Sequence, residues 1–152
     1  VRNDLNKEPI FPVPNNKILT VGKVLNNIHN SSKEIKNAYI TNPKIRNAFY
    51  RIKKGGKGNI FDNRPNSYFN ICKLIESKPS NTITKTRGIL HFIEQRYLTI
   101  NEVKTICSFP NDFILIGSNN QQWGQLGNSV MPNQMKAIAE TLKKEILHTA
   151  SG

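Results

Sequence analysis

The spacing of apolar residues predicts four helices along the chain. The first is short, because Thr20 can cap a helix that runs through Ile28 and carries its apolar residues on one side. The second begins at Asn42-Pro43, where asparagine suits the cap and proline suits the first helical position. Gly55 ends it. Its apolar residues recur at the spacing of one buried helical face, and they are Ile45, Ala48, Phe49 and Ile52.

Two further helices are predicted in the C-terminal third. Thr99 and Glu102 have the spacing of a capping box, which marks the start of a helix over 99–108. Pro110 stops this helix. The last helix begins at Met131-Pro132 and has a single apolar stripe, formed by Met135, Ile138, Ala139, Leu142 and Ile146.

The segments between these helices have no helical pattern. Three prolines fall within residues 6–17, which we expect to form an extended connector. Residues 29–41 are polar, and we expect them to be irregular. From 57 to 87, Gly, Pro, Asn and Ser separate short β-prone segments, so we expect short, twisted strands at 68–72 and 82–84.

Positive charge is concentrated in the middle of the chain. The whole chain carries 22 Lys and Arg against 10 Asp and Glu, a net charge of +12. Eleven of the basic and two of the acidic residues lie within 42–90, a local charge of +9, whereas residues 91–152 are neutral. This distribution suits a polyanionic partner such as nucleic acid, and a lysine-rich, solvated surface is the alternative.

The remaining composition limits the class of protein. A length of 152 residues suits one domain with at most a small appendage. Cys72, Cys107 and the three histidines show no metal-ligand spacing, so we expect no metal site and a reducing compartment. There is no apolar run of about eighteen residues and no basic-then-apolar leader, so we expect a cytoplasmic protein without a membrane span. The 21 asparagines are typical of AT-rich coding DNA and favour a bacterium or its phage.

Two blocks of sequence in the last third carry more specific information. The first is Arg96-Tyr-Leu-Thr-Ile-Asn-Glu102, followed by Ser-Phe-Pro-Asn-Asp-Phe113, and the second is Gln125-Leu-Gly-Asn-Ser-Val-Met-Pro132. Together they resemble the ninth and tenth motifs of the DNA (cytosine-5) methyltransferases. In that family the ninth motif organises the target-recognition domain and does not touch the chemistry. The resemblance therefore implies structural roles, and the residues concerned are Arg96, Thr99, Glu102, Gln125 and Gly127.

The second block is implied to line the S-adenosylmethionine pocket of this family. The residues concerned are Asn128, Ser129 and Val130. Their chemistry agrees, because Gly127 lets the backbone approach a ligand closely and the two polar side chains offer amide and hydroxyl hydrogen bonds. Met131 is a mild departure, since a proline often follows the valine in the family.

Two basic segments are candidates for contact with DNA. Residues 82–84 look like the family's Thr-Leu/Ile element, whose threonine touches the DNA backbone beside the flipped cytosine. The alternative is an edge strand whose threonines face water. The Gly-rich loop at 53–57 can bind phosphates through its lysines and backbone N–H groups, or it is only a basic helix C-cap. The candidate residues are Lys53, Lys54, Gly55, Gly56 and Lys57 in the loop, and Thr82, Ile83, Thr84, Lys85 and Arg87 in the other segment.

The blocks that carry the family's chemistry are absent. The nucleophile of the family is a cysteine thiolate that follows a proline, whereas Cys72 and Cys107 each follow an isoleucine. The Gly-rich cofactor loop, the Glu-Asn-Val block and the Gln-Arg-Arg block are missing too. We therefore expect no catalytic residue and no methyltransferase activity from this chain alone.

These inferences define a fold class and a domain plan. We expect an α+β piece of an α/β methyltransferase. A small mixed recognition domain of short strands and loops would be followed by two helices that return to a Rossmann-like catalytic domain not present in this chain. Residues 1–19 would be an extended connector from that domain, with 1–5 resembling the end of a strand. Residues 20–95 would be the target-recognition domain, and 96–152 the segment of the ninth and tenth motifs with the C-terminal helix.

The leading functional hypothesis is the DNA-recognition and cofactor-pocket-closing portion of a bacterial DNA (cytosine-5) methyltransferase that uses S-adenosylmethionine in restriction-modification. Its partners would be double-stranded DNA and an N-terminal catalytic domain or subunit. The start without Met favours a fragment over a natural split subunit. A dimer that buries the C-terminal helix is a further possibility. The alternatives are a non-enzymatic, sequence-specific DNA-binding module and an RNA-associated basic protein, and the latter leaves residues 96–132 unexplained.

Overall fold

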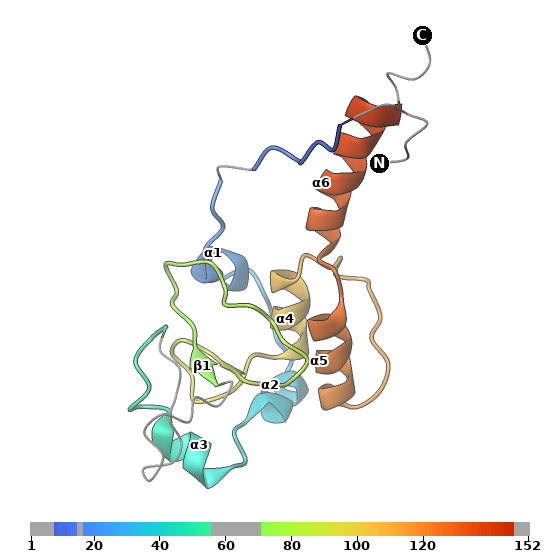
Figure 1. The fold of residues 1–152 in the computed structure, drawn as a ribbon. Coiled ribbons are helices and arrows are strands. Elements are labelled where there is room, and N and C mark those ends of the chain that lie inside the picture. Colours follow the sequence, from blue (N-terminus) through green and yellow to red (C-terminus); the bar gives the residue numbers. More distant parts are fainter. Residues whose placement is uncertain (1–7, 15–16, 56–70, 148–152) are drawn as a thin grey trace. The chain divides into compact units, whose positions relative to one another are not determined.

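The computed structural model describes residues 8–14, 17–55 and 71–147. The chain divides into two compact units (Figure 1). The larger unit spans 18–129, and the smaller unit combines 1–17 with 130–152. The strand end predicted for residues 1–5 lies outside the described residues.

Each described helix of the larger unit begins at a side chain that accepts a hydrogen bond from the backbone of its first turn. Thr20, Asn42 and Thr99 do so for the three helices predicted in this unit, which confirms these starts. The helices predicted to run from Thr20 to Ile28 and from Asn42 to Gly55 end earlier, at Leu25 and Ala48, because hydrogen-bonded turns replace their last residues. The helices are α1 (Val21–Leu25), α2 (Ser32–Ala38), α3 (Pro43–Ala48), α4 (Ile100–Ile106) and α5 (Asn119–Asn128).

Two of these helices were not predicted. Residues 29–41 were expected to be irregular, but they contain α2, which begins with a capping box between Ser31 and Glu34. Likewise, α5 begins with a capping box between Ser118 and Gln121. Both have the spacing that correctly marked the start of α4, so the signal was present in the sequence.

The sheet of the larger unit is small. β1 (Cys72–Lys73) pairs in parallel with β2 (Ile89–Leu90), with Cys72 opposite Ile89. The strand predicted at 68–72 is described only from residue 71 onward, where β1 begins at Cys72. The strand predicted at 82–84 is wrong, because these residues belong to no strand. The described chain is thus a small α+β arrangement, with more helix than expected.

A hydrophobic cluster in the core of the larger unit joins the α3 segment to the sheet. The four apolar residues predicted for the buried face of α3 are each 7% exposed or less, which confirms that face. They pack with Ile40, Ile71 and Leu90, and Tyr97 covers one side. Val103 and Cys107 of the α4 segment have no exposed surface.

The smaller unit contains the last helix. α6 (Pro132–Leu142) begins at the predicted proline and continues as a π-helical turn, η2 (Lys143–Leu147). Of the predicted apolar stripe, Ile146 is buried, whereas Met135 and Leu142 are 53% and 42% exposed. Residues 8–14 carry no helix or strand. Within the described ranges, no helix has the length and apolar character needed to cross a membrane.

Candidate functional site

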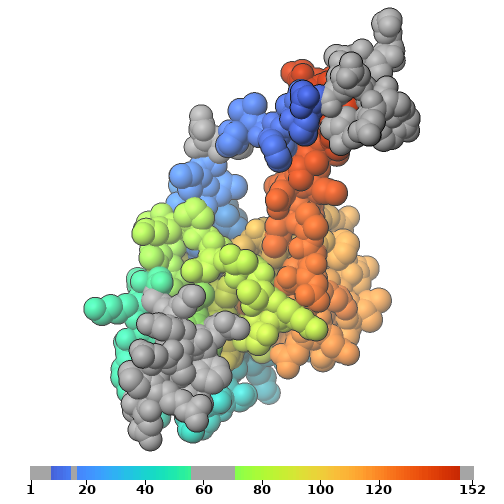
Figure 2. Space-filling view, in the orientation of Figure 1, coloured from blue at the N-terminus to red at the C-terminus, as the bar shows by residue number. Residues whose placement is uncertain are grey.

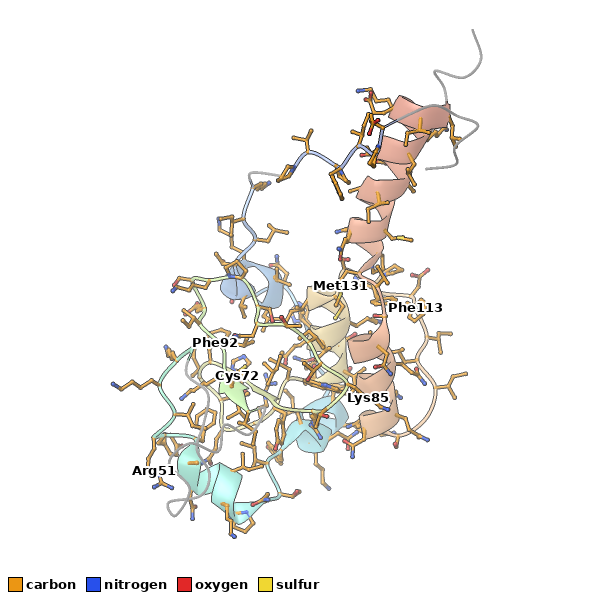
Figure 3. The ribbon with its side chains drawn as sticks, in the orientation of Figure 1. Arg51, Cys72, Lys85, Phe92, Phe113 and Met131 are labelled. Carbon is orange, nitrogen blue, oxygen red and sulfur yellow. The ribbon has the colours of Figure 1, made fainter. Side chains whose placement is uncertain are left out.

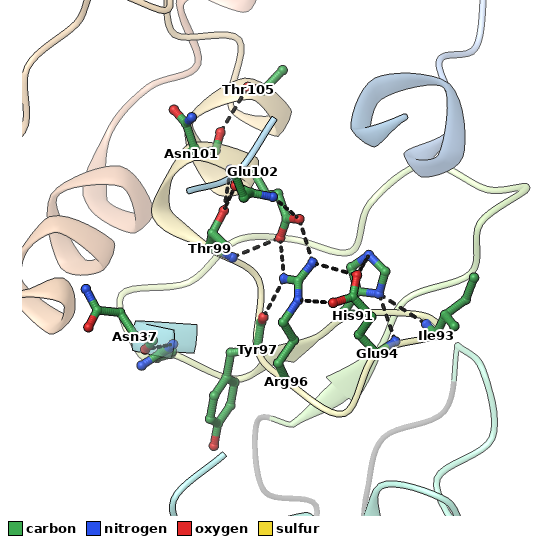
Figure 4. Close-up of polar contacts among 12 residues, drawn as sticks. Asn37, His91, Ile93, Glu94, Arg96, Tyr97, Thr99, Asn101, Glu102 and Thr105 are labelled. Carbon is green, nitrogen blue, oxygen red and sulfur yellow. Dashed lines mark hydrogen bonds and ion pairs between the residues drawn. The ribbon is translucent and has the colours of Figure 1, made fainter. Parts of the chain in front are cut away.

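Arg96 is the centre of a buried ionic network at the start of α4 (Figure 4). Its guanidinium donates to both carboxylate oxygens of Glu102, each at 2.8 Å. It also donates to both oxygens of Glu94, at 2.9 and 3.1 Å. Arg96 and Glu102 are only 2% and 3% exposed. A buried charge of this kind is tolerated because it is paired and hydrogen-bonded.

The same carboxylate ties α4 to a distant part of the chain. Glu102 accepts the Thr99 backbone N–H at 2.8 Å, which completes the predicted capping box. It also accepts the Asn30 amide at 2.9 Å, and the Thr99 hydroxyl donates to the Asn30 side-chain oxygen at 2.7 Å. The polar atoms of Glu102 are therefore used within the protein, which agrees with a structural role and leaves no atom for chemistry.

His91 lies beside this network in its neutral form. Its Nδ1 accepts the backbone N–H groups of Ile93 and Glu94, at 3.2 and 3.0 Å. Burial lowers the pKa of His91 below its ordinary 6.5, and the Arg96 charge adds to this effect against the nearby carboxylates. The hydrogen bonds from Arg96 lower the pKa of Glu94. A hollow of about 410 Å³ opens here, but Asn30, Arg96 and Glu102 in its lining are already bonded to one another.

Residues 82–85 place three of the predicted DNA-contacting side chains in solvent. Thr82, Thr84 and Lys85 are exposed, whereas Ile83 is 6% exposed and points into the core. The Thr84 hydroxyl donates to the Thr86 carbonyl at 3.2 Å. Ile83 can therefore anchor this segment but cannot reach DNA in this conformation.

Arg87 is held more closely by the protein. Its guanidinium donates to the Asn37 carbonyl at 2.9 Å and lies 4.6 Å from the centre of the Tyr97 ring. Burial lowers the pKa of Arg87, although the Tyr97 side chain opposes the shift. Any contact of Arg87 with DNA would compete with these bonds, so its assignment stays a prediction.

The basic loop after α3 is described only in part. Lys53 and Lys54 are exposed, and Gly55 has a φ of 78°, which favours glycine. The backbone N–H of Gly55 donates to the Lys73 carbonyl at 2.6 Å, so it is not available to a phosphate. Gly56 and Lys57 lie outside the described residues. The two lysines are the described groups of this loop that can still contact DNA.

α5 packs directly on the 82–85 segment. The indole N–H of Trp123, which has no exposed surface, donates to the Thr84 carbonyl at 3.0 Å. One turn later, a Cβ at Gly127 would overlap the Thr84 carbonyl and lie 2.6 Å from the Lys85 nitrogen. In Figure 2 the yellow-green 71–90 segment reaches the orange α5. This packing explains why residues 82–84 form no strand, because the Thr84 carbonyl is used by a side chain.

Trp123 was not among the predicted site residues. It is the only tryptophan of the chain, and it lies four residues before the Gly127 of the tenth-motif block. That spacing puts both residues on one face of a helix. No helix was predicted over 119–128, so this relation was missed, although Gly127 and Asn128 belong to the last turn of α5.

The residues predicted to line a cofactor pocket follow Gly127 along the chain. The Ser129 hydroxyl donates to the Leu126 carbonyl at 2.6 Å and closes the end of α5. The Asn128 side chain is exposed, and Val130, which belongs to the smaller unit, is 60% exposed. A carboxamide and an open apolar side chain suit the edge and the face of an adenine ring. The chemistry of each group, taken by itself, is therefore compatible with such a ligand. Gln125 instead donates to the Ile116 carbonyl at 3.0 Å.

The cysteines do not form a nucleophilic centre. Cys107 has no exposed surface, and burial raises the pKa of its thiol to about 11. Cys72, labelled in Figure 3, is buried in β1. A reactive cysteine needs an accessible thiolate, so neither environment suits attack on a base. In the part of the chain that the structure describes, His, Cys, Asp and Glu residues form no group of three that could hold a metal.

Comparison with known proteins gives a match to a protein family. The model of the C-5 cytosine-specific DNA methylases matches residues 2–144. The putative type II methyltransferase M.MJ0563P of Methanocaldococcus jannaschii is 28% identical over 130 residues, 86% of this chain and 42% of that protein. The type II methyltransferase M.AplI of Arthrospira platensis is 47% identical over 72 residues, 47% of this chain and 20% of that protein.

One relative has a different coverage. The type II methyltransferase M.AquIB of Picosynechococcus sp. is 28% identical over 134 residues, 75% of this chain and 95% of that protein. The chain thus spans less than half of M.MJ0563P but nearly all of M.AquIB.

Proposed function

Because the chain belongs to the C-5 cytosine-specific DNA methylase family, we propose that it is the DNA-recognition and cofactor-pocket-closing portion of a type II DNA (cytosine-5) methyltransferase. The packing of α5 on residues 82–85 carries this proposal. One helix holds the exposed Thr82, Thr84 and Lys85 and leads directly to Asn128 and Ser129. Such a helix would keep the DNA-contacting segment in register with the cofactor.

The proposed domain plan divides these tasks. Residues 20–95 form the target-recognition domain, and residues 96–152 carry the ninth and tenth motifs. The Arg96–Glu102 network supports this plan, because it joins α4 to Asn30 in the recognition part. Residues 1–19 connect to a Rossmann-like catalytic domain or subunit, which supplies the nucleophilic cysteine.

S-adenosylmethionine is the proposed methyl donor of the complete enzyme. Asn128, Ser129 and Val130 would contribute one wall of its site, while Gln125 and Gly127 position α5. Because a ligand of this size needs to be enclosed on most sides, the larger share of the site would come from the catalytic part. The donor would supply the methyl group, and the described residues of this chain would bind and orient.

Exposed apolar side chains support the existence of a protein partner. In the larger unit, Ile114 and Ile116 are 81% and 78% exposed. In the smaller unit, Met135 and Leu142 lie open on α6. We propose that a catalytic domain or subunit covers them, rather than a second copy of this chain. The coverage of M.AquIB supports a separate polypeptide as one form of this portion. We place the enzyme in the bacterial cytoplasm, where its DNA is.

A two-part experiment tests the proposal. Duplex DNA is titrated with the chain at several salt concentrations, and labelled S-adenosylmethionine is then added with and without the catalytic half of a related type II methyltransferase. We expect weak DNA binding that falls on the order of 10³-fold between about 50 and 200 mM salt if roughly six phosphates are contacted. Labelled cytosine should appear only in the combined sample.

The charge of the candidate residues provides the matched variants. Reversal of Lys53, Lys54 and Lys85 to Glu should remove most of the binding, whereas reversal of Lys136, Lys143 and Lys144 in the smaller unit should remove little. DNA binding without any rescue of methyl transfer would support the non-enzymatic DNA-binding module instead. Absence of DNA binding would overturn both readings.

A further inference from the structure

A hollow on the side of α5 is lined by polar side chains, most of which the proposed cofactor wall does not use. Its volume is about 440 Å³. It is lined by Lys85, Asn120, Gln121, Gly124, Gln125 and Asn128. The lining therefore contains one cation, four carboxamides and a glycine, and it contains no carboxylate.

The shape of the hollow follows from the helical repeat. Asn120, Gly124 and Asn128 lie four residues apart and form one line along α5. Gly124 in the middle has no side chain, and both the carbonyl oxygen and the Cγ of Lys85 lie 3.9 Å from the place of its missing Cβ. Lys85, which is labelled in Figure 3, thus lies against α5 at this glycine.

Three of the polar side chains that line the hollow are available to a ligand. Gln121 and Gln125 are used within the protein, since Gln121 accepts the Ser118 N–H at 2.8 Å and Gln125 donates to Ile116. Within the described ranges, the side chains of Lys85, Asn120 and Asn128 take part in no hydrogen bond or ion pair. All three are exposed. One ammonium and two carboxamides are therefore presented together.

We propose that this face of α5 is a second DNA-contacting surface, continuous with residues 82–85. The inference rests on the proposed function and extends its DNA contact onto a helix that the family resemblance assigned to the cofactor side. Lys85 would bind a backbone phosphate. Asn120 can donate to a phosphate or sugar oxygen and also accept from a base edge, whereas Asn128 at the far end of the hollow keeps its proposed place in the cofactor wall. A lining without carboxylates avoids repulsion of the polyanion.

The packing of α5 makes this surface preorganised. Trp123 bonds the Thr84 carbonyl, and Gly127 lets the Thr84-Lys85 peptide lie directly on the helix. The backbone of Lys85 is therefore held against the helix that carries Asn120 before DNA arrives, which lowers the ordering cost of binding.

Asn120→Asp tests the surface. Residue 120 is the second residue of α5, where a carboxylate favours the helix, so reduced binding will not come from lost helix stability. Asn101→Asp is the matched control, because it makes the same change at the second residue of α4, outside this hollow. We expect Asn120→Asp to weaken binding of the full chain to a duplex about fivefold to tenfold, from one repulsive charge near a phosphate. Asn101→Asp should change affinity less than about twofold.

Two further measurements separate the possible results. Lys85→Gln should reduce the slope of log affinity against log salt by about 0.9, the value for one phosphate contact. Emission from Trp123, the only tryptophan, should be the same in every variant if α5 stays packed. If Asn120→Asp binds like Asn101→Asp while Lys85→Gln loses its phosphate contact, the inference is overturned and the proposed function stands. If the chain does not bind DNA, both fall.

Discussion

At the scale of single residues, the buried Arg96 guanidinium makes the stability of the chain sensitive to substitution of its carboxylate partners. It contacts two carboxylates, of which Glu102 is as deeply buried as Arg96 itself. Burial alone would lower the pKa of Arg96, but the hydrogen bonds of Glu102 and Glu94 outweigh this and raise it. Arg96 therefore keeps its charge, and its burial depends on the bonds to Glu102.

Glu102→Gln should lower the free energy of unfolding by about 3 kcal/mol, because it leaves a buried guanidinium with half of its compensation. Urea denaturation of the variant and the wild-type chain measures the difference. The exposed pair Lys136–Glu140 offers a control, since Glu140→Gln should cost less than about 0.5 kcal/mol. Equal effects of the two substitutions would show that burial does not govern this network.

His91 should make stability depend on pH. Its folded pKa lies below the ordinary 6.5, so the unfolded chain takes up its proton first. The contribution of neutral His91 to the free energy of unfolding is therefore complete above about pH 6.5 and is lost as the pH falls through the lowered pKa. Arg96 disfavours the added proton, while Glu94, Glu102 and Glu76 partly oppose that effect.

Unfolding free energies measured between about pH 7 and 5 test this expectation. The wild-type chain should lose stability over this range, whereas His91→Gln should show a flatter profile at a lower overall stability. Glu94, whose pKa is also lowered, loses its contribution only as the pH falls below its ordinary 4.5. His29→Gln at an exposed position is the control. An unchanged slope in His91→Gln would contradict the assignment.

At the scale of elements, α5 and the segment packed on it form the unit most sensitive to small changes. Gly127→Ala should lower the free energy of unfolding by about 1–3 kcal/mol, because the new methyl group overlaps backbone that cannot move aside. Gly124→Ala in the same helix should raise it by about 0.5–1 kcal/mol, because its Cβ meets Lys85 only at 3.9 Å. Thermal or urea unfolding compares the two variants. The same sign for both would mean that the close approach at Gly127 does not hold in solution.

The elements also show what the sequence could predict. Local signals were sufficient where a cap and an apolar face coincide, as at Asn42 with Phe49 and at Thr99 with Val103. The capping boxes at Ser31 and Ser118 were equally local signals, but the residues that follow them are mostly polar, so no apolar face indicated a helix there.

The strand at 82–84 failed for a different reason. Its composition is β-prone, but the partner of the Thr84 carbonyl is an indole 39 residues away, and no local pattern contains that contact. The candidate site divides in the same way. The tenth-motif block named Asn128 as a candidate and the basic segment at 82–87 named Lys85, whereas the burial of Ile83 and the bonds of Arg87 and Gly55 depend on tertiary packing.

At the scale of the whole molecule, the chain should be an incomplete enzyme. One wall of a pocket cannot enclose S-adenosylmethionine, so the isolated chain should bind it no tighter than about 1 mM, roughly −4 kcal/mol. Calorimetry on the chain alone and on the chain with a catalytic half measures this. With both parts present, Asn128→Ala should weaken cofactor binding by about 1–2 kcal/mol through one lost polar contact. Micromolar affinity of the chain alone would mean that it holds a complete site.

The bonds between Asn30 and α4 also impose an order on biosynthesis. The partners of Asn30 are 69 and 72 residues further along the chain, and the first amides of α1 bond to carbonyls at Lys78 and Glu76. A ribosome delivers these partners long after the residues that need them. Until Glu102 has left the exit tunnel, the nascent N-terminal segment has unpaired polar groups and an uncovered apolar face. We therefore expect a chain that ends before α4 to be cleaved by proteases more readily than the full chain.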